Sequence, residues 1–294
     1  MSKNSNILGC IGALTVVAVW STTFVSSKVL LAHGLMPADI FFFRFVMAYV
    51  CMGVFCHKRL FSDNFLDELT LAGLGLMGGS LYFLTENMAL IYSTASNVSI
   101  LVSTTPLLTA MVLALFYRSE RMNRWQSLFS LVAFLGVVLV ILNGQFVLHL
   151  NPLGDALALG ASLTWAFYSL FMKHVMGRYS AEFITRKVFF YGLLTIMPYY
   201  FLVSPLQTSA EVLLQPLVIC NLLFLGLVAS MGCYLLWNWV MAQLGAVRST
   251  NFIYIQPLFT MVFASLILGE RVTLMAIIGA LVLIAGMWGM QKNK

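Results

Sequence analysis

Long apolar stretches follow one another along almost the whole chain, separated by short polar turns. A bilayer-spanning helix needs about 20 predominantly apolar residues, because the hydrocarbon core is about 30 Å thick and a helix rises 1.5 Å per residue. In lipid each stretch must be helical, since water is not available to its backbone amides. The pattern predicts ten spans, numbered one to ten in chain order: 7–31, 37–55, 71–91, 95–116, 125–142, 153–175, 188–203, 216–236, 246–268 and 273–290.

The composition strengthens this prediction. Hydrophobic residues make up 61% of the 294 residues and charged residues only 9%. In a soluble domain roughly a quarter of all residues are charged. Ten spans of about 20 residues leave too little chain for an extramembrane domain of ordinary size. The sequence therefore predicts an all-α integral membrane protein, multi-pass in the cell membrane and surrounded by lipid.

Basic residues predict which way the spans point. With the N-terminus in the cytoplasm, thirteen of the 16 Lys and Arg residues fall on the cytoplasmic side, two fall outside and Arg44 remains within the membrane. Cytoplasmic loops are the ones that carry such an excess, so we expect both termini in the cytoplasm. The net charge of +6 is therefore explained by the excess of basic residues in cytoplasmic loops, and no nucleic acid partner is predicted. The cytoplasmic residues are Lys3, Lys58, Arg59, Arg118, Arg121, Arg124, Lys173, Arg178, Arg186, Lys187, Arg248, Lys292 and Lys294, and the outer ones are Lys28 and Arg271.

The two halves of the chain repeat each other. Residues 8–20 (LGCIGALTVVAVW) align with 153–165 (LGDALALGASLTW) at an offset of 145. Residues 75–109 align with 226–260 at an offset of 151, with matches at Gly, Asn, Pro and Thr positions. Membrane composition alone does not readily hold one offset over so many polar, Gly and Pro positions.

Each half contains five predicted spans, an odd number, so the second half must cross the membrane in the opposite orientation. We divide the chain accordingly into repeat one, residues 1–143, and repeat two, residues 144–294. Inverted repeats of this kind are typical of alternating-access transporters, whose sites lie near the bilayer midplane between the repeats. The repeat is the strongest functional signal in the sequence.

Short motifs in both repeats carry a family resemblance: Trp20-Ser21, Pro37, Arg44-Phe45, Ala89-Leu90, Pro106 and Ser119-Glu120-Arg121, with Gly154-Asp155, Trp165, Pro257 and Gly269-Glu270-Arg271 as their counterparts. In this order and spacing they resemble the EamA family of the drug/metabolite transporter superfamily, over nearly the whole chain. The family often has Gly after the first-helix Trp, where this chain has Ser21 and, in repeat two, Ala166. The resemblance implies a ten-helix bundle in a bacterial plasma membrane, with a cavity lined largely by spans one, three, four, six, eight and nine. It also implies export or exchange of small metabolites.

Two charged residues lie deep within predicted spans, where a charge costs about 2.5–3.5 kcal/mol even on lenient scales. By helix rise, Arg44 lies about 10 Å and Glu86 about 8 Å below the outer end of its span. One interpretation is a buried ion pair that only holds spans two and three together. The other makes Glu86 a cavity-facing acceptor for a proton or a substrate amine. Arg44 has a basic counterpart in Lys187, whereas the counterpart of Glu86 is Trp237.

Pro106 and Pro257 occupy equivalent positions within spans four and nine. Each removes a backbone donor and frees the carbonyl four residues earlier, at Val102 or Ile253. A fixed kink and a transport hinge are both consistent with this placement.

Other candidates for binding substrate or protons are polar or aromatic residues within the spans, and for each aromatic one packing or an interfacial position is the alternative. With Glu86 and Arg44 they are Asn87, Tyr82, Trp20, Trp165, Tyr168, Asn238, Asn251, Tyr254 and Gln256.

The residues favour a secondary active transporter of small polar metabolites, such as amino acids or related compounds, over two alternatives. An intramembrane enzyme needs a His, paired carboxylates or metal ligands within reach of one another. Here Glu86 is the only deep carboxylate, and His33, His57, His149 and His174 fall in loops or at span ends. A channel-type facilitator is expected to show rings of charge or a carbonyl filter. No cofactor or metal is predicted, and the expected partners are a small-molecule substrate, with protons as a second candidate, and the bilayer.

Overall fold

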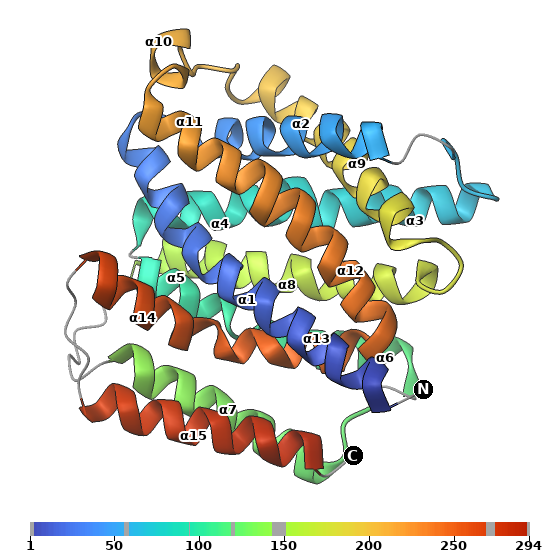
Figure 1. The fold of residues 1–294 in the computed structure, drawn as a ribbon, viewed down its shortest axis with the longest axis vertical. Helices are drawn as coiled ribbons and strands as arrows, with labels where there is room; N and C mark the ends of the chain where they lie inside the picture. Colours follow the sequence, from blue (N-terminus) through green and yellow to red (C-terminus); the bar gives the residue numbers. More distant parts are fainter. Residues whose placement is uncertain are drawn as a thin grey trace.

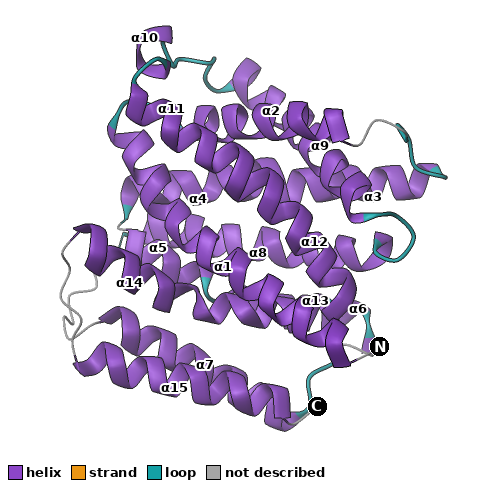
Figure 2. Ribbon diagram, viewed as in Figure 1, coloured by secondary structure: helices purple, strands orange, loops and turns teal. Residues whose placement is uncertain are grey.

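The computed structural model describes residues 3–55, 59–93, 95–118, 121–142, 151–268 and 274–292. Within these ranges the chain forms helices joined by turns, with no β-sheet (Figure 2). This confirms the predicted all-helical class. Some residues used in the sequence analysis lie outside the described ranges: His57, Lys58, Ser119, Glu120, His149, Gly269, Glu270, Arg271 and Lys294.

Repeat one contains α1 (Lys3–Ala32), α2 (Pro37–Phe55), α3 (Phe65–Gly75), α4 (Leu81–Tyr92), α5 (Ala95–Val102), α6 (Thr105–Phe116) and α7 (Arg124–Leu142). A π-helical segment, η1 (Leu76–Ser80), joins α3 to α4 without a break, so that the two form one long helix.

Repeat two contains α8 (Pro152–Val175), α9 (Ala181–Leu202), α10 (Ala210–Leu213), α11 (Pro216–Leu223), α12 (Cys233–Leu244), α13 (Ala246–Thr250), α14 (Gln256–Leu268) and α15 (Leu274–Lys292). The π-helical segment η3 (Phe224–Gly232) continues α11 into α12, and the 3-10 segment η4 (Asn251–Ile255) joins α13 to α14. The two π-helical segments occupy overlapping positions when the repeats are aligned at the offset of 151.

Several helices begin where the sequence supplies a cap. The side chain of Asn64 accepts a hydrogen bond from the Asp67 backbone N–H at 2.8 Å, at the start of α3. Ser180 caps α9 and Asn151 caps α8 in the same way. These contacts satisfy amides that have no partner within the helix itself.

The two repeats exchange contacts reciprocally. In Figure 1, α1 of repeat one runs alongside α12 of repeat two, and α8 of repeat two packs against α4 of repeat one. At one edge of the bundle α7 lies alongside α15. Their approach depends on small residues, since a Cβ atom at Gly136 would lie 2.3 Å from the backbone nitrogen of Leu283. Small residues allow such close packing of membrane helices.

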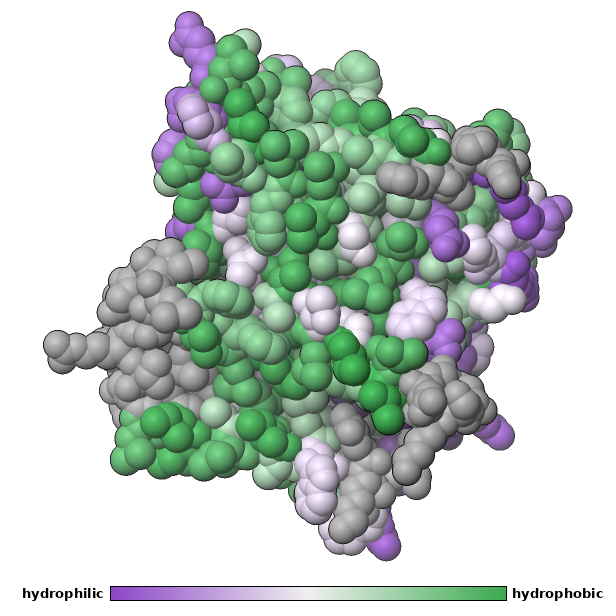
Figure 3. Space-filling view, in the orientation of Figure 1, coloured by the Kyte–Doolittle hydropathy of each residue, from purple (hydrophilic) through white to green (hydrophobic). Residues whose placement is uncertain are grey.

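Three helical segments are both long and apolar enough to cross a membrane by themselves: Asn6–Ala32, Pro37–Val54 and Pro216–Leu244. Spans four and nine are broken into shorter helices, and α8 contains charged residues such as Asp155 and Lys173. The count of ten spans therefore stays a prediction. The surface agrees with a lipid environment, because Figure 3 shows apolar side chains over most of one face and hydrophilic ones mainly toward its edges.

In the view of Figure 1, the first turn of α1 and the last turn of α15 lie on the same side of the bundle. This is the arrangement that an even number of spans produces. The side of the membrane on which they lie stays a prediction.

Candidate functional site

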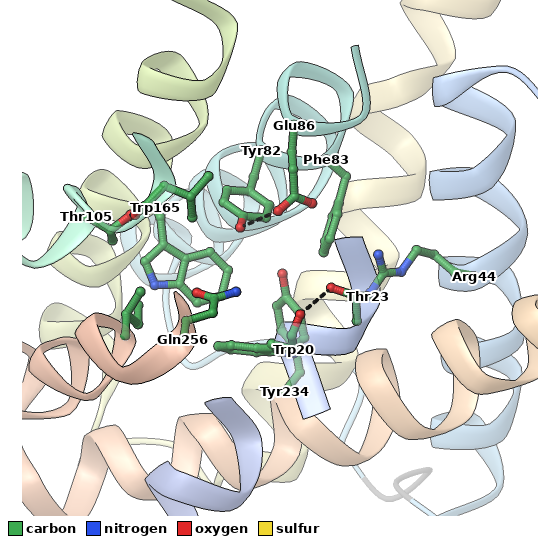
Figure 4. Close-up of a pocket in the computed structure, with 12 residues that line it drawn as sticks. Trp20, Thr23, Arg44, Tyr82, Phe83, Glu86, Thr105, Trp165, Tyr234 and Gln256 are labelled. Atoms are coloured by element: carbon green, nitrogen blue, oxygen red, sulfur yellow. Dashed lines mark hydrogen bonds between the residues drawn. The ribbon is translucent and has the colours of Figure 1, made fainter. Parts of the chain in front are cut away.

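A cavity lies between the repeats, near the middle of the bundle (Figure 4). Its lining residues are Trp20, Thr23, Arg44, Tyr82, Phe83, Glu86, Val102, Thr105, Trp165, Tyr234, Ile253 and Gln256. Six of the sequence-predicted site residues meet there: Trp20, Arg44, Tyr82, Glu86, Trp165 and Gln256. They are separated by up to 236 positions in sequence, so only the fold brings them together.

All six spans that the family resemblance implied contribute to this lining, and Arg44 of α2 is an addition to them. The contributing elements are α1, α2, α4, α5, α6, α8, α12, η4 and α14.

Glu86 faces the cavity from α4 and is held by its own helix. The Tyr82 hydroxyl, one turn earlier, donates a hydrogen bond to Glu86 Oε1 at 2.9 Å. Only 5% of Glu86 is exposed. This carboxyl group therefore occupies a fixed position at the cavity wall, where a proton or a cationic group of a solute could reach it.

Arg44 reaches the same cavity from α2 but does not pair with Glu86. No ion pair within 4.0 Å joins the two side chains, both of which the structure describes. Arg44 Nε instead donates to Ser230 Oγ at 2.8 Å, and its guanidinium carbon lies 4.0 Å from the centroid of the Phe83 ring. The structure therefore does not show the direct ion pair that was one of the two interpretations of these residues. Tyr82 and Ser230 supply the hydrogen bonds that the pair would have made.

The side chains of Trp20 and Trp165 contact each other in the cavity lining, with the edge of one ring facing the plane of the other. Their ring centroids are 5.3 Å apart at an interplanar angle of 86°, a favourable geometry for aromatic rings. The Trp20 indole N–H donates to the Ala229 carbonyl at 3.0 Å, whereas the buried indole N–H of Trp165 has no hydrogen-bond partner. Equivalent residues thus differ in what holds them.

The two prolines lie just after breaks in their spans. Pro106 is in the first turn of α6, beyond the gap that follows α5, and Pro257 is the second residue of α14, beyond η4. The carbonyl of Val102, freed by Pro106, accepts a hydrogen bond from the Thr105 hydroxyl at 2.6 Å. Pro106 therefore begins a new helix after the gap, whereas Pro257 lies where the 3-10 segment η4 changes to the α-helix α14 without a gap.

Five other predicted site residues lie outside the cavity lining: Asn87, Tyr168, Asn238, Asn251 and Tyr254. Most of them hold helices together. Asn87 donates to the Pro37 carbonyl at 3.2 Å. Asn238 accepts a hydrogen bond from the Tyr168 hydroxyl and donates to the hydroxyl of Thr185. The Tyr254 and Ser130 hydroxyls share a hydrogen bond of 2.7 Å.

Sequence reasoning missed six residues of the lining as site residues: Thr23, Phe83, Val102, Thr105, Tyr234 and Ile253. The repeat itself could have found most of them. At the offsets of 145 and 151, four pairs of equivalent positions line the cavity together: Trp20 with Trp165, Phe83 with Tyr234, Val102 with Ile253, and Thr105 with Gln256.

A second polar cluster joins the repeats at the start of α3, before span three begins. Asp67 accepts hydrogen bonds from the Tyr179 hydroxyl at 2.7 Å and from Arg178 at 2.9 Å. These partners lower the pKa of Asp67, the Tyr179 hydrogen bond contributing most. Next to it, Glu68 forms an ion pair with Lys187.

Burial by itself would raise the pKa of Glu68. Hydrogen bonds from Lys187, Ser62 and Tyr191 outweigh burial and lower this pKa to about 2. Lys187, the counterpart of Arg44 in repeat two, is thus bound in this cluster and not in the cavity.

The sequence model of the EamA-like transporter family matches the chain twice, over residues 7–142 and 152–291. Among curated proteins, an "uncharacterized transporter" of Archaeoglobus fulgidus is 27% identical, over 94% of this chain and 94% of its own length.

Two relatives are named "probable amino-acid metabolite efflux pump". The one from Salmonella typhimurium is 29% identical, over 98% of this chain and 95% of its own length. The one from Escherichia coli is 26% identical over similar shares, 98% and 95%. A solved crystal structure is similar to the whole chain with a TM-score of 0.71 at 14% identity, covering 98% of its own chain, which shows a shared fold.

Proposed function

Because the chain belongs to the EamA-like transporter family and is a multi-pass membrane transporter, we propose that it exports small polar metabolites by secondary active transport. Amino acids or related compounds are the substrate class that we favour. The mechanism that we propose is alternating access between two inverted five-helix repeats, residues 1–143 and 144–294, around the cavity of Figure 4.

The observation that carries this proposal is the paired lining of the cavity. Four pairs of equivalent positions from the two repeats meet there. If the repeats are inverted, a cavity lined in this way can be opened to either side by related movements of its two halves. The proposed hinges at Pro106 and Pro257 are supported by their position in the chain, because each follows directly after a lining residue, Thr105 or Gln256.

Glu86 supplies the coupling group in this proposal. A buried carboxyl that faces a solute can carry a proton when the solute is absent and release it when a cationic group binds. Export as the direction, and amino acids as the class, are supported by the printed names of the Salmonella and Escherichia relatives.

Neither alternative gains support from the cavity. An intramembrane enzyme needs a nucleophile or a metal next to a general base, and Glu86 is the only acidic residue in the described lining. A channel-type facilitator predicts a ring of like groups along an open path, whereas this lining places one acid and one base on different helices.

Purified protein in proteoliposomes tests the proposal directly. A panel of radiolabelled amino acids, amines, nucleobases and small acids is offered with and without a pH gradient. We expect accumulation of at least one amino acid that depends on the gradient. Equal rates in protein-containing and empty liposomes for the whole panel would contradict the proposed function.

The ten-span topology is tested separately by reporter fusions. One reporter follows Lys294 and another is inserted in the turn between Tyr92 and Ala95. We expect them on opposite sides of the membrane, with the C-terminal one in the cytoplasm. Both reporters on one side would exclude the ten-span arrangement.

A further inference from the structure

The guanidinium of Arg44 is buried and held in place, yet no carboxylate of the described residues forms a direct ion pair with it. Only 1% of the residue is exposed. Nε donates to Ser230 and the Phe83 ring lies against the guanidinium plane, while Nη1 is buried with no hydrogen-bond partner. A buried cationic N–H without an acceptor is costly, and natural structures keep such groups mainly where they serve a purpose.

The acid in the same cavity leaves this cation available. Glu86 accepts its hydrogen bond from Tyr82, on its own helix, and does not contact Arg44. In Figure 4 the Arg44 side chain reaches the cavity beside Thr23 and Phe83, whereas Glu86 lies beside Tyr82. A solute in the cavity therefore meets a basic group and an acidic group at two separate positions.

We propose that Arg44 is the anion anchor of this cavity and that it binds the carboxylate of the transported solute through Nη1. This inference rests on the proposed function and adds the group that the substrate must carry. Guanidinium and carboxylate form strong, charge-assisted hydrogen bonds with defined geometry. Ser230 acts as a positioning residue, because its hydrogen bond to Nε orients the guanidinium while Nη1 is left for the solute.

Comparison with Lys187 supports this role. Lys187 occupies the equivalent position in repeat two, but its ammonium group pairs with Glu68 outside the cavity. The basic residue of repeat two has thus found a carboxylate within the protein. The basic residue of repeat one has not, although the nearest cavity acid is on a neighbouring helix.

Matched ligand pairs test the anchor through binding. Tryptophan fluorescence of the purified protein, to which all six tryptophans contribute and of which Trp20 and Trp165 line the cavity, is titrated with leucine, phenylalanine and threonine. Each is compared with its amide, which keeps the ammonium group but lacks the carboxylate. For at least one pair we expect the parent protein to bind the acid about tenfold or more tightly than the amide, the value of one charge-assisted hydrogen bond.

Variants then assign the preference to Arg44. Arg44→Gln should bind acid and amide with similar affinity. Arg44→Lys should keep only part of the preference, because it retains the charge but loses the guanidinium geometry. Ser230→Ala should reduce the preference, and Lys187→Gln should keep it as the matched control. If Arg44→Gln fails to fold, as judged by size-exclusion chromatography, Arg44→Lys and Ser230→Ala still give the answer.

Three results would overturn the anchor: no binding of any acid by the parent, equal binding of acid and amide, or a preference that persists undiminished in both Arg44 variants. Failure of the proposed function looks different. It would appear as selective binding without any transport in proteoliposomes, whereas failure of the anchor alone would appear as transport without a preference for the carboxylate.

Discussion

The two repeats contribute equivalent residues to the cavity lining, but the hydrogen bonds that hold these residues differ between the repeats. Trp20 and Trp165 are equivalent, yet the Trp20 indole donates to the carbonyl of Ala229 while that of Trp165 has no partner. The carbonyl equivalent to Ala229 is that of Gly78, and it accepts a hydrogen bond from the Tyr234 hydroxyl instead. Tyr234 can donate this hydrogen bond because it carries a hydroxyl group, which its counterpart Phe83 lacks.

The charged groups differ even more between the repeats. Glu86 has Trp237 as its counterpart, and Arg44 has Lys187, which lies outside the cavity. In this comparison the paired positions provide a frame common to both halves, whereas the charged groups Glu86 and Arg44 have no counterpart in the cavity lining. Substitutions at unpaired positions should therefore change what is transported and how it is coupled. Those at paired positions should change the movement or the stability.

The largest effect is expected at Glu86. Glu86→Gln keeps the size and the hydrogen bond from Tyr82 but cannot exchange a proton, so we expect folded protein that loses pH-dependent, concentrative transport. Coupling between two binding sites typically changes an affinity by about 5- to 150-fold, and we expect the accumulation of substrate driven by a pH gradient to fall by a factor in that range. Transport against pH in proteoliposomes measures it, with Glu211→Gln, an exposed acid of α10, as the control. An unchanged pH profile and substrate affinity would return Glu86 to a purely structural role.

Next come the paired prolines. Pro106→Ala and Pro257→Ala allow helix to extend toward the breaks beside the cavity, since alanine restores a backbone donor. We expect each variant to remain monodisperse in detergent while its turnover slows several-fold, because the proposed hinges stiffen. Initial rates at saturating substrate provide the measurement. Parental rates in both variants would remove the hinge from the mechanism.

A smaller effect distinguishes the two tryptophans. Trp20→Phe removes an indole N–H that donates to Ala229, so the protein should lose about 1 kcal/mol of stability from that hydrogen bond. Trp165→Phe removes an indole N–H that has no partner in the protein, and the loss from hydrogen bonding should be absent. Urea-induced unfolding of both variants in the same detergent measures the difference in stability. Equal destabilisation would break the comparison between the repeats.

The smallest effect concerns the cluster at the start of α3. The pKa of Glu68 is lowered to about 2 from an ordinary value of 4.5, so the stabilisation from its partners is fully present above about pH 4.5. It should be lost as the pH falls from there toward 2, because the unfolded chain takes up the proton first. Thermal unfolding of the parent and of Glu68→Gln over this range measures the effect. A parallel pH dependence in both proteins would contradict it.

Much of the fold followed from local patterns. The long apolar stretches predicted helices, and α2, α7 and α11 begin within one residue of the predicted starts of their spans. Boundaries were less accurate where polar residues continue a helix: α9 begins at Ala181, whereas span seven was predicted from residue 188. The reason is that Ser180 caps this helix before the apolar stretch begins.

The site was predicted only in part. Deep charges and repeated aromatic residues pointed to Glu86, Arg44, Trp20 and Trp165, all of which line the cavity; their roles in binding stay a prediction. Polar character alone placed Asn87 and Asn238 in the same group, although their side chains hold helices together. Sequence cannot separate these cases, because an amide that binds a backbone carbonyl and one that faces a cavity look identical along the chain.

The amino-acid pattern alone indicates a helical chain that lies in lipid, because hydropathy and helix length are properties of contiguous residues. It also predicts two related halves, and the family model matches each of them separately. Only the packing of the helices shows that Arg44 and Glu86 do not pair, that Tyr82 and Ser230 hold them instead, and that Lys187 binds Glu68. These are contacts between side chains on different helices or on successive helical turns, and their choice among several nearby partners depends on how the helices cross.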